Sequence, residues 1–115
     1  MVEESLSSLF NEWWEINKQI AHDLENFDFK ELKESRSKQR KIEDIIYKIV
    51  QKNAPENLNI ELPDDCSQME VGFDFNNSIF YFIMEDPDYE DDLKLIAIKI
   101  NKEKEISIEK DFNFE

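Results

Sequence analysis

Residues 6–27 read LSSLFNEWWEINKQIAHDLENF, and their apolar side chains recur at steps of three and four. In an α-helix this spacing gathers the side chains on one stripe. The stripe consists of Leu6, Leu9, Phe10, Trp13, Ile16, Ile20, Leu24 and Phe27. We therefore expect an amphipathic helix that Ser5 or Ser7 caps at its start and that breaks at residues 26–28.

A second helix is expected to follow at once. Asp28 stands three residues before Glu31, a variant of the capping box that marks helix starts. The helix should end near Lys52, before Pro55, and its apolar residues are Phe29, Leu32, Ile42, Ile45, Ile46, Ile49 and Val50. Residues 34–41 are all polar, so here the helix either extends beyond the core or faces water and a partner.

After Pro55 apolar and polar residues alternate, which is the period of half-buried strands. Asn76-Asn77 favours a tight turn into residues 79–84, which are apolar on both faces and predict a central strand. The five expected strands are residues 58–62, 69–75, 79–84, 93–100 and 105–114.

This order predicts an α+β fold. An N-terminal two-helix hairpin, residues 1–53, should pack on one face of a roughly five-stranded antiparallel meander sheet, residues 56–115. With 115 residues the chain is too short for two cores of ordinary stability, so we expect a single domain, 1–115. No apolar run approaches the ~18 residues that span a bilayer, and residues 1–4 do not resemble a signal peptide. We therefore expect a cytoplasmic protein that makes no membrane contact.

The charges divide the chain into unlike parts. Residues 30–52 carry eight basic and four acidic side chains, whereas the rest of the chain carries six basic and twenty-four acidic ones. Residues 53–93 contain twelve acids and no Lys or Arg. Such a field attracts a basic partner and repels phosphates, so a basic protein is the expected partner and nucleic acid is not. Alternatively, the acids only keep a small protein soluble.

Catalytic chemistry is not expected. His22 is the only histidine and lies off the apolar stripe. Cys66 is the only cysteine, and the preceding Asp64-Asp65 would suppress its thiolate. Residues 86–92 alternate acids as a calcium loop does, but they lack the glycine at the sixth position and the glutamate at the twelfth. We therefore predict no enzymatic activity, no cofactor and no metal site.

The leading functional hypothesis is an acidic binding protein of the immunity or inhibitor type. It would mask a basic surface, such as that of a toxin directed at nucleic acid, with acids that stand in for phosphates. The expected contact residues lie at two places that would meet if their loops share one end of the sheet. They are Asp64, Asp65, Glu85, Asp86, Asp88, Tyr89, Glu90, Asp91 and Asp92.

The second hypothesis is an oligomerisation or scaffold module in which charge serves only solubility. Trp14 lies beside the apolar stripe, where it either widens the core or anchors a dimer or partner interface, since tryptophan is enriched at interfaces. The central strand is apolar on both faces, so one set of its side chains needs cover beyond the helices. The residues assigned to a homodimer interface are Trp14, Phe80, Phe82 and Met84, with Ile79, Tyr81 and Ile83 as the other parity of the strand.

Overall fold

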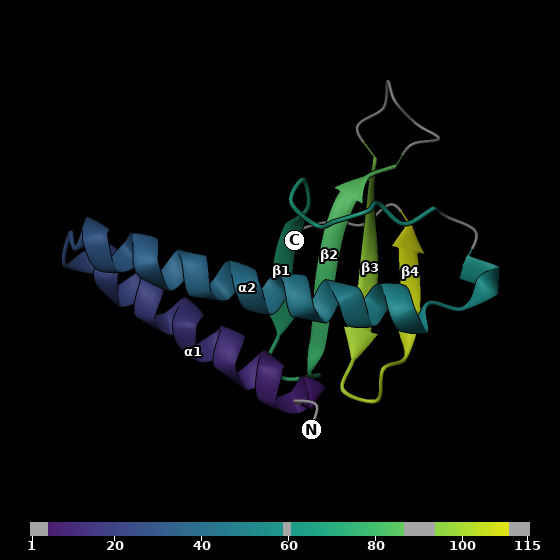
Figure 1. The fold of residues 1–115 in the computed structure, drawn as a ribbon, viewed down its shortest axis with the longest axis horizontal. Coiled ribbons are helices and arrows are strands. Elements are labelled where there is room, and N and C mark those ends of the chain that lie inside the picture. The colour runs from purple at the N-terminus through teal and green to yellow at the C-terminus, as the bar shows by residue number, and fades with distance from the viewer. Residues whose placement is uncertain (1–4, 59–60, 87–93, 111–115) are drawn as a thin grey trace.

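The computed structural model describes residues 5–58, 61–86 and 94–110. The helices and strands in chain order are α1 (Leu6–Glu25), α2 (Phe29–Asn53), the short 3-10 helix η1 (Glu56–Leu58), β1 (Glu70–Asp74), β2 (Ile79–Glu85), β3 (Leu95–Asn101) and β4 (Ile106–Lys110). The strands form one sheet in the order β1-β2-β3-β4, and each neighbouring pair is antiparallel (Figure 1). The α+β class and the meander are thus confirmed.

The described part of the chain holds four strands, one fewer than predicted. Leu58 belongs to η1, and Leu62 lies in a loop although its side chain packs against the core. The physical reason lies in Pro63, whose carbonyl oxygen accepts hydrogen bonds from side chains of α2. The loop is therefore held by α2 and not by a strand ladder. Residues 59–60 and the predicted end of the last strand, 111–114, lie outside the described residues.

Both helices begin and end as their sequences predict. The Ser5 hydroxyl accepts a hydrogen bond from the Ser8 amide, and the Asp28 carboxylate accepts one from the Glu31 amide. At the end of α1, the Phe27 amide donates to the Leu24 carbonyl and the Asp28 amide donates to the Asp23 carbonyl. These two bonds form a Schellman motif, which places Phe27 in the left-handed position usually held by glycine.

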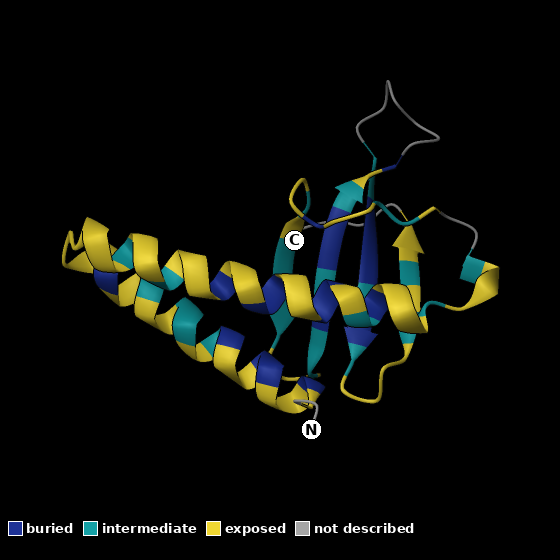
Figure 2. Ribbon diagram, viewed as in Figure 1, coloured by how far each residue is buried: buried dark blue, intermediate teal, exposed yellow. Residues whose placement is uncertain are grey.

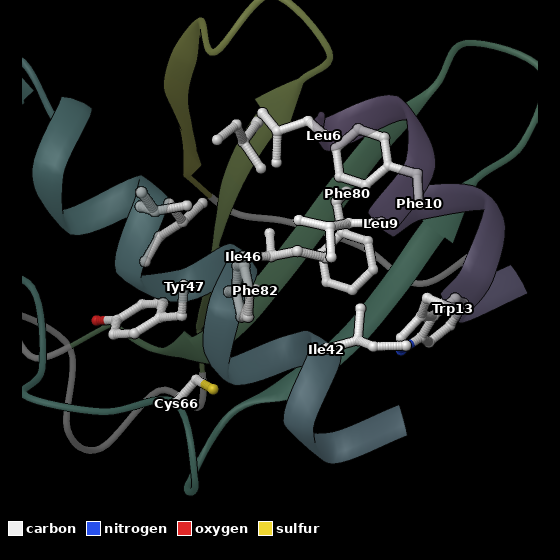
Figure 3. Close-up of a cluster of buried hydrophobic side chains, with 13 residues drawn as sticks. Leu6, Leu9, Phe10, Trp13, Ile42, Ile46, Tyr47, Cys66, Phe80 and Phe82 are labelled. Atoms are coloured by element: carbon white, nitrogen blue, oxygen red, sulfur yellow. The ribbon is translucent and has the colours of Figure 1, made fainter. Parts of the chain in front are cut away.

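The core lies between the helices and one face of the sheet. The first half of α1 and the second half of α2 supply it, together with β2 and β3 (Figures 2 and 3). Its buried side chains are Leu6, Leu9, Phe10, Trp13, Ile42, Ile46, Tyr47, Val50, Cys66, Phe80, Phe82, Ile98 and Ile100. The other halves of both helices extend past β1 as a projecting arm, which explains the polar middle of α2 (Figure 1).

The register decides which side chains of the sheet face the helices. Phe80 pairs with Ile100 and Phe82 with Ile98, and all four belong to the core that the helices cover. Because side chains alternate along a strand, Tyr81 and its partner Lys99 lie on the opposite face. There the Lys99 ammonium lies 5.8 Å from the centre of the Tyr81 ring and 3.5 Å from Glu109 Oε1.

Candidate partner-binding site

The loop between η1 and β1 is fixed on α2 by side chains of that helix. The Tyr47 hydroxyl donates to the Pro63 carbonyl at 2.6 Å. The side-chain amide of Gln51 donates to the same carbonyl at 3.1 Å and to the Asp64 carbonyl at 3.0 Å. Arg40 Nη2 donates to the Ser67 carbonyl at 3.3 Å. These bonds engage the loop backbone and leave the Asp64 side chain at the surface.

Cys66 anchors the middle of this loop. Its side chain is buried in the core beside Tyr47 (Figure 3), and the thiol donates to Asp44 Oδ1 at 3.4 Å. Burial, with a smaller effect of the Asp44 carboxylate, raises the pKa of the Cys66 thiol to about 12. Burial, with smaller effects of Cys66, Asp65 and Asp64, likewise raises the pKa of Tyr47 to about 12. Cys66 is thus held as a neutral thiol that packs, as the sequence predicts.

Asp65 is locked in place by its own loop. Its Oδ1 accepts hydrogen bonds from the Ser67 hydroxyl at 2.6 Å and from the Ser67 amide at 3.0 Å. Both bonds favour the ionised form and lower the pKa of the Asp65 carboxyl. The result is an exposed carboxylate with a fixed position and a permanent charge near neutral pH.

Asp64 and Asp65 share a groove with the end of β2. The groove has a volume of about 480 Å³ and is lined by Pro63, Asp64, Asp65, Gln68, Met69, Met84 and Glu85. Asp64 and Asp65 thus lie at the same end of the sheet as Glu85, the first residue of the second place. Among the described residues that line the groove, three are acidic and none is basic. Its lining also includes Met69 and Met84, so a cation with an apolar stem would fit its chemistry.

The assignment of Asp86 to the partner-binding site was wrong, because the residue is buried. The residue is only 3% exposed, and its amide donates to the Lys94 carbonyl at 2.8 Å, where the ladder of β2 and β3 continues beyond both strands. It is therefore buried at the end of the sheet and does not line the groove, while the exposed Glu85 remains available for contact. The other assigned residues, Asp88, Tyr89, Glu90, Asp91 and Asp92, lie outside the described residues.

A second hollow lies on the other side of the same loop, with a volume of about 340 Å³. The loop contributes residues 64–67, and α2 contributes Arg40, Asp44, Tyr47, Lys48 and Gln51. The loop thus separates a hollow of mixed charge from the purely acidic groove. Sequence reasoning missed Arg40 and Gln51 as supports of the site, because nothing local in α2 marks a residue that binds a loop more than ten positions away.

A polar cluster between α1 and α2 was also missed. The Glu43 side chain is 5% exposed; its Oε2 accepts from Trp13 Nε1 and from Arg36 Nη1, both at 2.9 Å. Gln39 accepts from Arg36 at 2.8 Å and donates to Asn17 at 3.2 Å. The cluster borders a hollow of about 400 Å³ beside β1. No buried side-chain nitrogen or oxygen in the described residues lacks a hydrogen-bond partner, so the cluster is explained as the joint between the two helices.

The residues assigned to a dimer interface are not brought together on one surface. Phe80 and Phe82 are 0% exposed and lie under the helices, so they cannot form an interface on the open sheet face. Met84 lines the acidic groove. Trp14 is half-buried and stacks on Phe75, with ring centres 5.3 Å apart. Of the two roles considered for Trp14, its contacts with Phe73 and the core fit a wider core.

Comparison with known proteins gives no relative. No protein-family model, curated protein or solved structure matches this chain. Within the described residues, neither helix has the length and apolar character needed to cross a bilayer. The same part of the chain contains no cluster of three or more histidine, cysteine or acidic residues suited to a metal ion.

Proposed function

We propose that this protein is an acidic binding protein of the immunity or inhibitor type, which neutralises a basic target by covering its surface. The observation that supports the proposal is the groove of Asp64, Asp65 and Glu85, whose described lining holds three carboxylates and no cation. Glu85 lies at this end of the sheet, and four further acids of the proposed site follow it in the sequence, Asp88, Glu90, Asp91 and Asp92.

The site is built for electrostatic recognition. Lysine and arginine side chains bring a charged head on an apolar stem, and the groove is lined by three carboxylates together with Met69 and Met84. A surface that binds phosphates presents such cations, so carboxylates at fixed positions can occupy it as a phosphate backbone would. An acidic field of this kind speeds the encounter with a basic protein by ~10 to 1000-fold at low salt.

The first test is co-purification of the tagged full chain from its native host at low and at high salt. A stoichiometric basic protein that is retained at low salt and released at high salt supports the proposal. A chain that is recovered alone and self-associated, at both salt concentrations, contradicts it and favours the oligomerisation hypothesis instead.

The second test neutralises the site in the identified complex. The variant carries Asp64→Asn, Asp65→Asn, Glu85→Gln and Glu90→Gln. The matched control removes the same charge from exposed carboxylates away from the groove: Glu12→Gln, Glu25→Gln, Glu34→Gln and Glu105→Gln. We expect the site variant to lose the complex while its urea unfolding transition is kept. Equal affinities of the two variants would show that overall charge, and not this groove, carries the binding.

A further inference from the structure

The projecting arm ends in apolar side chains that face solvent. Leu24 is 51% exposed, Phe27 is 76% exposed and Phe29 is 64% exposed. The rings of Phe27 and Phe29 meet edge to face, with centres 6.4 Å apart. An isolated exposed apolar residue needs no explanation, but three at the tip of one arm form a patch of the kind that marks an interaction site.

Phe27 is also held in an unfavourable backbone conformation. Its φ is 56°, in the left-handed region that a bulky side chain rarely adopts. The Schellman motif requires this conformation, and glycine would adopt it without strain. Glycine would therefore suit this position better, and the aromatic residue that stands there is both strained and exposed. This is a second and independent sign that the tip is shaped for contact.

A groove runs from this patch along the arm. It has a volume of about 590 Å³ and is lined by Leu24, Phe29, Leu32, Lys33, Arg36, Ser37 and Arg40. On α2 these residues recur at steps of three and four, so they form one face of the helix. The floor is apolar, and each charged side chain that lines it is basic. Lys33 makes no ion pair with any described residue.

We propose that this groove binds an acidic segment of a partner protein, a helix whose large apolar side chains fill the groove and whose carboxylates meet Lys33 and Arg40. The argument is charge complementarity around an apolar floor, which is how amphipathic helices are recognised. The site is separate from the acidic groove and has the opposite sign, so the protein would join a basic and an acidic partner.

The same charges argue against the other occupants. A symmetric pair of arms would bring Lys33 and Arg40 of one copy against those of the other, and like charges oppose such a contact. An anionic membrane or a nucleic acid would meet the field of a chain with net charge −14. A short acidic helix meets the same overall field, but it contacts only the arm, and residues 30–52 carry eight basic against four acidic side chains.

The test is selection from a displayed library of helical peptides with the full chain as bait. Each peptide carries leucine or phenylalanine at positions i, i+3 or i+4, and i+7, and is random elsewhere. We expect Asp and Glu to be enriched at the random positions. Synthetic versions of the selected peptides are then titrated against variants by fluorescence polarisation, and Lys-substituted peptides should not bind.

Two variants change the groove, each with a matched control. Phe29→Ser and Lys33→Glu should each weaken the peptide by about tenfold or more. Ile45→Ser removes an apolar side chain of α2 that is 46% exposed, and Lys41→Glu changes the same charge; neither residue lines the groove, and both should bind the peptide as the unaltered chain does. Phe27 does not line the groove, but its ring packs on that of Phe29, so Phe27→Gly should weaken binding. It should do so without a loss of thermal stability, because glycine suits its backbone.

Three results would overturn the proposal. They are a library that enriches no sequence or enriches basic ones, groove and control variants that bind alike, and a self-association of the chain that Phe29→Ser abolishes. The last result would assign the groove to a second copy. None of these variants alters Asp64, Asp65 or Glu85, so loss of the peptide is distinguishable from loss of a basic partner at the acidic groove.

Discussion

Removing Arg36 should destabilise the fold because it leaves the buried Glu43 carboxylate without its positive partner. The Glu43 side chain is 5% exposed, and Arg36 reaches both of its oxygens, at 2.9 and 3.4 Å. Breaking a fully buried ion pair by removing one partner costs about 3–5 kcal/mol. Because the Arg36 side chain is 44% exposed, water can partly take its place, and we expect Arg36→Met to cost about 2 kcal/mol.

The assay is urea unfolding at neutral pH, followed by the fluorescence of Trp13 and Trp14; the Trp13 indole donates to the same carboxylate. With a denaturant slope of about 1–2 kcal/mol/M, the midpoint of Arg36→Met should fall by about 1–2 M. The double variant Arg36→Met/Glu43→Met should recover most of the loss and unfold within about 1 kcal/mol of the unaltered chain, since no charge is then left buried.

The matched control is Lys18→Met. Lys18 lies 2.9 Å from Glu15, but both side chains are more than half exposed, so its removal should change stability by less than about 0.5 kcal/mol. The reasoning is refuted if the double variant is as unstable as the sum of its two single variants. Additivity would mean that the Glu43 carboxylate does not depend on Arg36 for its charge to be tolerated.

Three further predictions concern the core, the thiol and a turn. Phe82→Ala should lower the free energy of unfolding by about 3–5 kcal/mol in urea titrations, because the buried Phe82 packs against Tyr47 with ring centres 5.1 Å apart. If the variant kept its stability but lost a homodimer in sedimentation experiments, that would contradict the place of Phe82 in the core. Cys66 should resist thiol reagents until the protein unfolds. Because folding raises the pKa values of Cys66 and Tyr47, the folded state binds these protons more tightly, so the free energy of unfolding should fall as pH rises above 9.0, the ordinary thiol value. A free energy of unfolding that is flat or rising there would be evidence against this. The Asp74 carboxylate accepts hydrogen bonds from the side chain and backbone amide of Asn77 and from the backbone amide of Asn76, and these bonds lower its pKa. Asp74→Ala should therefore reduce the melting temperature at neutral pH, and the difference in melting temperature between the two proteins should shrink as pH falls below 3.8. A difference that stays constant with pH would speak against this.

Patterns that depend on neighbours in the chain were predictable. The steps of three and four in α1, the cap at Asp28 and the alternation of β1 to β4 all act over a few residues, so the sequence carries them openly. The alternation of residues 58–62 misled because packing from a loop and packing from a strand produce the same apolar spacing, and only Tyr47 and Gln51 decide between them.

The candidate site was predictable in its charge and not in its geometry. The absence of Lys and Arg from residues 53–93 indicated an acidic surface, and Asp64, Asp65 and Glu85 do line one groove. The burial of Asp86 depends on how β2 and β3 close, and the parity of Phe80 and Phe82 depends on which face the helices cover. Both depend on contacts between residues far apart in the sequence, and a strand that is apolar on both faces does not show which face is covered.

The projecting arm implies that part of the molecule can unfold locally at a lower free energy than the whole chain. Past β1, within the described residues, the two helices pack on each other, through contacts such as the hydrogen bond from the Ser35 hydroxyl of α2 to the buried Asp23 of α1. Opening the arm exposes little of the sheet core, so its amide protons should exchange with solvent through a local transition of lower free energy than global unfolding. Amides of β2 and β3 should exchange only when the whole chain unfolds. A ligand on the arm would then slow exchange there while the sheet stays unchanged, and hydrogen exchange would locate it without any substitution.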